Sequence, residues 1–486
     1  MDFSLSTKAQ NDKFPKNFTN FTKIYKFKFS LSKNLYFRAI MTLLNSNYYE
    51  GEPMKLVKLS LVAAMAAGTF SALDAKPLEE AIKDVDVSGA LRYRFDQVSW
   101  GKKDYENFGA YGVPESNTPH RFRAFVTPSL SVGDGFKVVG QLMYNNDKNG
   151  GWQKGGYSST GKQADNGLTT TKSEVVLKQA YLQYDLADAG VSVLYGKQQL
   201  NTIWTADFTG MAAKVLITPT QGLTIAAFGV DSFEGNAGDP DAAEIDGTGA
   251  YSNNMYGAAV LANFAGLDAQ VWGAYWDRVA TLYAANLKYT LGLGGGNNVG
   301  VKVTYLGNSM DSDFKKLNLD GVDNGNLVDG RVFAKFAGLD AQVGGIFYGK
   351  KDKATINTLE DISGPDLYIG REMFYAGKTS LVQSVGQSVF GYVGVGYTLP
   401  MDLRVGVQGV FGQNTTTGAT DDVKDTRIEG VFELGYKVNK NLSLEGWYSY
   451  LNSSVKDDPY KGVVVTTDTS KNQNKQTVRL QALYKF

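Results

Sequence analysis

The chain has no cysteine and a single histidine, His120, among its 486 residues. Without cysteine it cannot form thiolate metal sites, disulfide bridges or a cysteine nucleophile. A serine hydrolase would depend on His120, and no nucleophile-elbow sequence lies near this residue. Most catalytic arrangements are excluded, and the sequence predicts a protein that is not an enzyme.

Long hydrophobic runs are also missing. Residues 54–75, MKLVKLSLVAAMAAGTFSALDA, have a basic start at Lys55 and Lys58, an apolar stretch, and a plausible cleavage residue, Ala75. The apolar stretch is too short to cross a bilayer of roughly 30 Å, and no later run reaches the roughly 18 apolar residues of a membrane helix. We therefore expect a signal peptide at 54–75 and no helical anchor.

Residues 1–53 are rich in Lys, Phe, Asn and Tyr and have no clear periodicity, which is typical of translated AT-rich intergenic DNA. Codons for Glu50, Gly51 and Glu52 can contain a ribosome-binding core just before Met54. We expect translation to start at Met54, with a genuine amino-terminal extension as the alternative. Residues 76–486 then form the mature domain.

Removal of residues 1–75 makes the chain acidic. These residues carry ten Lys or Arg and five Asp or Glu, which leaves 39 basic and 44 acidic residues of the 49 of each kind. This mild excess does not suggest nucleic acid as a partner. It favours cations if the acidic groups line a pore.

What the sequence does contain is segments in which apolar and polar residues alternate. In the terminal stretch TVRLQALYKF (477–486), apolar residues occupy every second position up to Phe486, with Leu483 as the exception. This pattern is typical of the closing strand of a bacterial outer-membrane barrel. Similar segments predict eighteen strands, an even number, at 85–97, 119–130, 136–146, 173–185, 191–199, 213–218, 223–233, 254–264, 269–279, 281–291, 298–310, 326–336, 341–350, 386–398, 402–413, 426–438, 441–453 and 477–486.

The connections alternate in length, as periplasmic turns and extracellular loops do. Short turns rich in Gly, Asn and Asp include AGLD at 265–268 and again at 337–340, within the repeated octapeptide FAGLDAQV. Long polar loops include 98–118, 147–172, 234–253, 351–385 and 454–476. The fold class predicted is an all-β, antiparallel transmembrane barrel, with TVRLQALYKF paired to the strand that begins near Val85.

Aromatic residues near strand ends fit interfacial girdles, although ordinary strand aromatics are the alternative. They are Tyr144, Tyr184, Trp272, Trp276, Tyr305, Tyr397, Trp447 and Tyr484.

Charged residues on or beside strands are the candidates for the lining of a lumen. The basic ones are Arg92, Arg94, Arg121, Arg123, Lys178, Lys197, Arg404, Arg427 and Arg479. The loop at 231–247 has six carboxylates, Asp239 and Asp241 among them, and no Lys or Arg. It is either a solvated surface loop or a segment that dips into the pore and recruits cations or Ca²⁺.

Several segments closely resemble the major outer membrane porin of Campylobacter and its epsilon-proteobacterial relatives. They are KPLEEAIKDVDVSGALRYRFD (76–96), GKQQLNTIWT (196–205), GLTIAAFGVDSF (222–233), YLGNSMDS (305–312) and TVRLQALYKF. The stretch 196–214 stands at the third long connection, where general porins fold a loop inward.

This resemblance implies a homotrimeric general porin of the bacterial outer membrane that passes small hydrophilic solutes and ions with weak cation preference and has antigenic or adhesive loops. It implies a constriction with Asp207 among its residues, and a Ca²⁺ site formed by Asp207, by Asp239 or Asp241, and by Glu360. We expect Tyr484 and Phe486 to close the barrel in the lipid, and Phe486 to be the residue read by the outer-membrane assembly machinery.

Two rival functions use the same barrel. A substrate-specific channel could use a ladder of Tyr93, Arg92, Arg94, Arg121 and Arg123. A surface adhesin or structural protein could carry an incidental pore. A TonB-dependent transporter is not expected, because only about ten residues separate the predicted cleavage point from the first strand and leave no room for a plug domain.

Overall fold

The computed structural model describes residues 85–100, 116–117, 120–145, 174–233, 250–318, 321–360, 366–367, 370–375, 379, 381, 385–417, 421–456 and 473–486. All of them belong to the larger of two compact units of the chain, Met65–Phe486. The predicted signal peptide and the predicted Ca²⁺ ligands Asp239 and Asp241 lie outside the described residues.

The described residues form one antiparallel sheet. Its strands are β1 (Val85–Trp100), β2 (Ser116–Asn117), β3 (His120–Gly133), β4 (Phe136–Asn145), β5 (Glu174–Leu186), β6 (Val191–Gln199), β7 (Thr209–Thr220), β8 (Leu223–Phe233), β9 (Met255–Phe264), β10 (Leu267–Trp276), β11 (Ala280–Gly294), β12 (Asn297–Met310), β13 (Asn326–Phe336), β14 (Leu339–Ala354), β15 (Val385–Thr398), β16 (Leu403–Thr417), β17 (Asp422–Lys437), β18 (Leu442–Lys456) and β19 (Gln473–Lys485). Short helices lie in the connections: η2 (Ala187–Ala189), η3 (Ala250–Ser252), α5 (Ser312–Leu317) and η4 (Met373–Tyr375). None of the helices in the described ranges is long and apolar enough to cross a bilayer.

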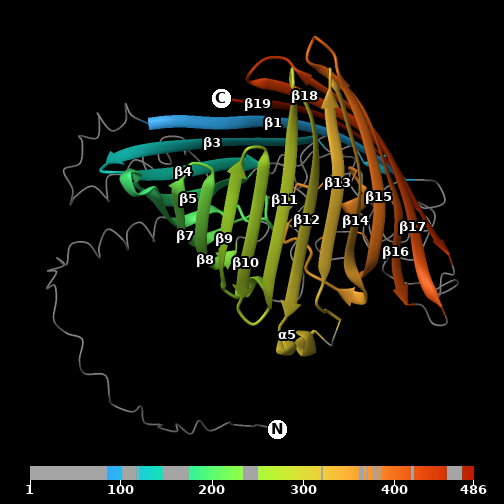
Figure 1. The fold of residues 1–486 in the computed structure, drawn as a ribbon, viewed down its shortest axis with the longest axis horizontal. Coiled ribbons are helices and arrows are strands. Elements are labelled where there is room, and N and C mark those ends of the chain that lie inside the picture. The colour runs from blue at the N-terminus through green and yellow to red at the C-terminus, as the bar shows by residue number, and fades with distance from the viewer. Residues whose placement is uncertain are drawn as a thin grey trace, which may run out of the picture. The chain divides into compact units, whose positions relative to one another are not determined.

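The sheet closes into a barrel because its first and last strands pair. β19 lies beside β1 (Figure 1), with residue pairs that run from Ala90 opposite Lys485 to Trp100 opposite Lys475. The N–H of Phe486 donates to the carbonyl of Gly89 at 3.0 Å, and the N–H of Gly89 donates back at 2.9 Å. Closure leaves no sheet edge with unpaired backbone groups in lipid, as the terminal sequence predicts.

The prediction of eighteen long strands is confirmed, and β2 adds only two residues. Five boundaries differ by four residues, namely the starts of β7, β17 and β19 and the ends of β14 and β16. β7 begins at Thr209 rather than 213, because Gly210 and Ala212 hide the alternation at its start. β10 ends at Trp276 rather than 279, because the next residues form the tight turn to β11.

Strand residues alternate between the lumen and the outer face. On β17, Asp425, Arg427 and Glu429 are buried, whereas Ile428 and Phe432 between and after them are exposed. The other strands have the same two faces, with apolar side chains turned outward. A barrel in lipid requires such an apolar outer band, whereas the inward face carries both charged residues and a buried hydrophobic cluster.

The repeated octapeptide forms the same hairpin twice. Ala265 and Gly266 have φ angles of 48° and 87°, and Ala337 and Gly338 have 48° and 85°. Two successive positive φ angles define the turn that matches the twist of paired strands. Both turns lead from an odd-numbered strand to the next even-numbered strand of an antiparallel sheet, so they lie at the same end of the barrel.

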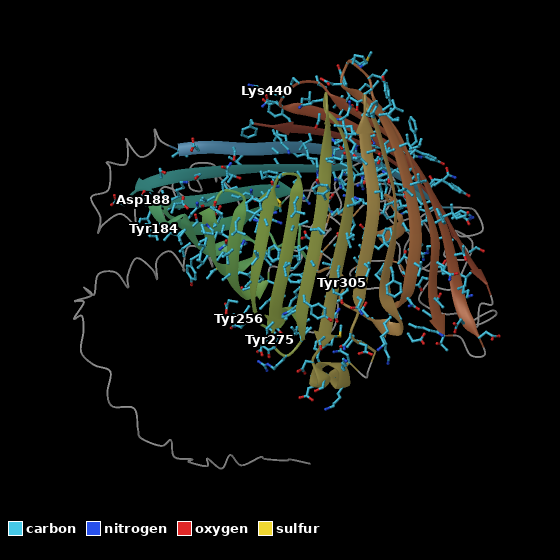
Figure 2. All side chains as sticks on the ribbon, in the orientation of Figure 1. Tyr184, Asp188, Tyr256, Tyr275, Tyr305 and Lys440 are labelled. Atoms are coloured by element: carbon cyan, nitrogen blue, oxygen red, sulfur yellow. The ribbon has the colours of Figure 1, made fainter. Side chains whose placement is uncertain are left out.

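The predicted girdle aromatics divide into two groups. Figure 2 shows Tyr184 near one end of the barrel and Tyr305 toward the other, where Tyr256 and Tyr275, which are not among the predicted residues, also lie. Of the predicted tyrosines, Tyr397 and Tyr484 are exposed, as the girdle interpretation predicts, whereas Tyr184 and Tyr305 are half-buried. The tryptophans contradict the girdle interpretation. Trp272, Trp276 and Trp447 are buried, because they occupy positions of their strands whose side chains face the lumen.

Candidate functional site

The described residues of the β14–β15 loop, 355–360, 366–367, 370–375, 379 and 381, fold into the barrel. Several of its apolar residues are buried in the main hydrophobic cluster: Ile356, Leu359, Leu367, Met373, Phe374 and Leu381. The prediction of an outer polar loop at 351–385 is therefore wrong for these residues. Their apolar side chains need cover, and the interior of the barrel supplies it.

One carboxylate ties this loop to the β6–β7 loop (residues 200–208). Glu360 is buried and accepts hydrogen bonds from the backbone N–H groups of Ala206, Asp207 and Phe208, the last two at 2.8 and 3.1 Å. The N–H of Leu359 donates to the carbonyl of Trp204 at 2.9 Å. The inward folding expected of the 196–214 stretch is confirmed, but two loops share the task.

A second attachment joins the β14–β15 loop to β12 and β13. The carboxylate of Asp366 accepts from Lys302 and from Arg331, each at 2.8 Å. Burial raises the pKa of Asp366, but the hydrogen bond from Lys302 and the charges of Lys302 and Arg331 outweigh it, so that the pKa lies below its usual value.

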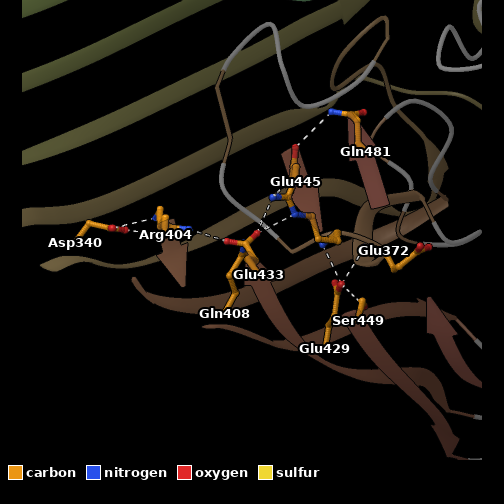
Figure 3. Close-up of polar contacts among 10 residues, drawn as sticks. Asp340, Glu372, Arg404, Gln408, Glu429, Glu433, Glu445, Ser449 and Gln481 are labelled. Carbon is orange, nitrogen blue, oxygen red and sulfur yellow. Dashed lines mark hydrogen bonds and ion pairs between the residues drawn. The ribbon is translucent and has the colours of Figure 1, made fainter. Parts of the chain in front are cut away.

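A third attachment reaches β17 (Figure 3). The carboxylate of Glu429 accepts from the backbone N–H groups of Arg371, Glu372 and Met373, each at 2.9 Å, and from the hydroxyl of Ser449 at 2.7 Å. Gly370 has a φ of 78°, and a Cβ at this position would lie 2.2 Å from the carboxylate. Only glycine lets the loop approach Glu429 so closely.

Ion pairs extend this attachment across the lumen wall (Figure 3). Arg371 contacts Glu433 at 2.7 Å and Glu445 at 3.0 Å. Arg404 contacts Asp340 at 2.7 Å and Glu433 at 3.2 Å. The predicted lumen residue Arg404 therefore belongs to a charge network with the loop. Four of these residues, Arg371, Arg404, Glu433 and Glu445, border a recess of about 530 Å³ near the short turns.

Five arginines form one wall of the lumen, which we call the arginine wall. Arg92 lies opposite Arg123, and Arg94 lies opposite Arg121, across the β1–β3 pairing. On the other side of β1, Arg479 lies opposite the buried Asp96 and donates to it at 3.0 Å. The side chains of these residues point to the same side of the sheet as the buried Ala90 and Asp96, which is the lumen side. The structure therefore brings all five predicted residues together.

Tyr93 is not part of this wall. It lies on the outer face, where it is exposed and where its hydroxyl contacts the ring of His120. The parity of a strand explains this placement, since Tyr93 stands between two inward residues.

The other predicted basic residues are scattered. Lys178 is buried at a bulge in the β4–β5 pairing. Arg427 is buried on β17 and pairs with Asp425 at 2.7 Å. Lys197 lies opposite the exposed Met211 on the outer face, away from the lumen.

The exposed charges of the constriction are carboxylates. Asp207 lies 3.6 Å from Arg123, and their side chains are 56% and 4% exposed. Asp366 is 68% exposed, whereas its partner Lys302 is 2% exposed. Water at the two inner loops therefore meets negative groups more than the cations that hold them.

The predicted Ca²⁺ ligands are only partly brought together. Asp207 and Glu360 are adjacent, through the hydrogen bond from the Asp207 N–H. Glu360, however, already accepts three N–H groups, and the described ranges contain no group of three acidic or histidine side chains that could hold a metal. These residues alone do not fit a Ca²⁺ site, which usually offers six to eight oxygen ligands.

A closed barrel of eighteen long strands, with loops folded into a charged lumen, is the architecture of outer-membrane channels. The profile of one family, described as Campylobacter major outer membrane protein, matches residues 54–486. The chain belongs to this family. It is an outer-membrane porin, as the resemblance of its sequence implies. A search among curated protein sequences gives no match.

Solved structures share the fold at low identity. Pseudomonas aeruginosa OccK9 (OpdG) is 14% identical with a TM-score of 0.58, covering 84% of this chain and 100% of its own. Acinetobacter baumannii OccAB3 is 12% identical with a TM-score of 0.58, covering 83% and 100%. Pseudomonas aeruginosa OpdK with vanillate is 14% identical with a TM-score of 0.56, covering 82% and 98%. At this level of identity the solved structures show a shared fold.

Proposed function

We propose that this porin is a passive diffusion channel for small hydrophilic solutes and ions. The observation that carries the proposal is the pair of inner loops, fastened to each other by Glu360 and to the barrel wall by Asp366 and Glu429. Fastened loops narrow a lumen without closing it, so solutes pass by size and charge, with no cofactor or energy source.

A weak cation preference forms part of the proposal. It is supported by the exposure of Asp207 and Asp366 beside buried Arg123 and Lys302. Exposed carboxylates at a constriction raise the local concentration of cations.

Assembly and surface roles follow the family resemblance. We propose a homotrimer whose long loops act as antigenic or adhesive surfaces, and recognition of Phe486 by the outer-membrane assembly machinery. A Ca²⁺ ion at Asp207 and Glu360, with Asp239 or Asp241, stays a prediction, and no step of the mechanism depends on it.

A substrate-specific channel is the second candidate, and the arginine wall favours it. Flux assays separate the two functions. We expect permeation of the purified protein in vesicles to rise linearly with solute concentration if the channel is general. Saturation at low concentration would favour a specific channel, and a folded protein without permeation would favour the adhesin.

A further inference from the structure

We infer that the recess beside the short turns binds small multivalent anions, which carry two or more carboxylate or phosphate groups. Its volume of about 530 Å³ suits a compact organic molecule. This site is separate from the constriction at the inner loops, and the inference does not depend on how solutes diffuse through the pore.

The recess lies at the end of the barrel that carries the short turns. It is bordered by the β15–β16 turn (399–402) and the β17–β18 turn (438–441). Like the turns of the repeated octapeptide, both lead from an odd-numbered to an even-numbered strand, so they lie at the same end. In bacterial outer-membrane barrels the short turns face the periplasm, and the recess should therefore meet periplasmic solutes.

Three lysines at the rim of this recess are available to a ligand. Lys437 ends β17, Lys440 lies in the β17–β18 turn, and Lys485 ends β19. All three are exposed, and none of them forms an ion pair with a residue that the structure describes. Three ammonium groups are thus offered to the water at this end of the lumen.

Hydrogen bonds hold the segments that carry these lysines together. The N–H of Lys485 donates to the carbonyl of Asn441 at 2.8 Å, and the side-chain amide of Asn441 donates to the carbonyl of Lys485 at 2.6 Å. The N–H of Lys437 donates to the carbonyl of Asp402 in the neighbouring turn at 3.3 Å. Two turns and the closing strand therefore form one rim with fixed positions for the three charges.

The deeper charges of the recess largely neutralise one another. Arg371 and Arg404 both contact Glu433, at 2.7 and 3.2 Å, and each contacts a further carboxylate. Of the carboxylates in the lining, Asp402 alone has no ion pair within the described ranges. The unpaired charges are thus three positive and one negative, and this excess attracts anions.

The lysines also indicate the class of anion. An ammonium group is a compact point charge on a flexible stem, and it does not impose the planar, bidentate geometry of a guanidinium group. It binds carboxylate and phosphate alike, so the number of negative charges matters more than their arrangement. Because one exposed ion pair contributes little, a monovalent anion should bind weakly, whereas a multivalent anion contacts several lysines at once.

Isothermal titration calorimetry of the purified, folded protein tests this inference. The probe is tricarballylate, which has three carboxylates, and propionate is its counterpart with one. We expect tricarballylate to bind at least about tenfold more tightly than propionate. Lys437→Gln/Lys440→Gln/Lys485→Gln should weaken the binding of tricarballylate at least about tenfold, for the same reason. The charge-conserving Lys437→Arg/Lys440→Arg/Lys485→Arg should retain binding, which guards against a folding defect.

Lys137→Gln/Lys288→Gln/Lys335→Gln is the matched control, because it removes the same charge at the same end of the barrel from lysines outside the recess. Each of these lysines has a carboxylate beside it or directly opposite, and these are Asp185, Asp268 and Asp340, respectively. This variant should bind tricarballylate as tightly as the wild-type protein does.

Several outcomes would overturn the inference. They are equal affinity for the two anions, unchanged affinity in the glutamine variant of the rim, and an equal loss of affinity in the control variant. Absence of measurable binding to the wild-type protein would also do so. A protein that binds tricarballylate but never conducts would support this site and refute the proposed diffusion channel.

Discussion

At the scale of single residues, two carboxylates hold the inner loops because each accepts several backbone N–H groups. Glu360 and Glu429 each accept three. A hydrogen bond to a charged acceptor contributes about 1.5–3 kcal/mol, and a buried N–H that loses its acceptor is costly. Both residues position the constriction although neither is expected to touch a solute.

We predict that Glu360→Gln lowers the free energy of unfolding by about 1–3 kcal/mol, because an amide oxygen replaces the charged acceptor of three N–H groups. Urea unfolding in lipid vesicles measures this. Asp313→Asn is the control, since Asp313 forms an exposed ion pair with Lys316. An equal effect of the two substitutions would contradict the role of Glu360.

A second prediction concerns pH and the loop that contains α5. Hydrogen bonds from Lys315 and Lys350 hold the pKa of Asp323 well below its usual range. A lowered folded pKa stabilises the protein fully above the unfolded pKa of about 3.9, and this stabilisation is lost progressively as the pH falls from that value through the folded pKa. NMR titration of the Asp323 carboxyl should have its midpoint below 3.9. A midpoint at or above this value would contradict the cluster.

At the scale of elements, the β14–β15 loop acts as a strap across the lumen. It is attached to the β6–β7 loop, to β12 and β13, and to β17. Because the attachments lie on different sides of the barrel, loss of one should loosen the strap and leave the barrel closed.

Glu429→Gln should therefore increase the single-channel conductance and the current noise of the open pore, because three backbone N–H groups lose their charged acceptor. Planar-bilayer recordings measure both quantities. Asp422→Asn is the control, since Asp422 forms a solvent-exposed ion pair with Lys351 of β14 and accepts no backbone N–H of the strap in the described residues. Unchanged conductance in Glu429→Gln would show that the strap does not limit flow.

The terminal strand gives the fourth prediction. Phe486 exchanges two backbone hydrogen bonds with Gly89, and its ring lies on the outer face, 6.2 Å from that of Tyr484. Deletion of Phe486 should remove most of the protein from the outer-membrane fraction. Lys485→Gln, which leaves the terminal ring in place, should not. Normal assembly after the deletion would refute the role of Phe486.

The strands could be predicted from the sequence because lipid and water face opposite sides of each one, which forces alternation along Val85–Trp100 or Asp422–Lys437. The alternation of side chains between the two faces of a strand could also have predicted that Tyr93 and Lys197 lie on the outer face. The strap could not be placed so directly, since its attachments join residues far apart in sequence, such as Glu360 and Ala206. Its one local signal was the set of apolar residues between Ile356 and Leu381 in a loop otherwise polar.

At the scale of the whole molecule, the barrel separates two tasks. On the outer face, apolar side chains contact the lipid, and the pairing of β19 with β1 gives the backbone N–H and C=O groups of both strands hydrogen-bond partners. The lumen holds the charges, divided between the arginine wall and the carboxylates of the inner loops. Selectivity thus depends on how far the arginines and the carboxylates are each exposed to the water of the lumen, and the fold alone does not determine it.

The most direct test of a passive, charge-biased pore is the conductance and reversal potential of the refolded mature protein in a planar bilayer under a salt gradient. We predict current steps in groups of three and a reversal potential that indicates weak cation preference. Asp207→Asn should reduce this preference, because it removes the exposed carboxylate of the constriction. A folded protein that never conducts would contradict the account.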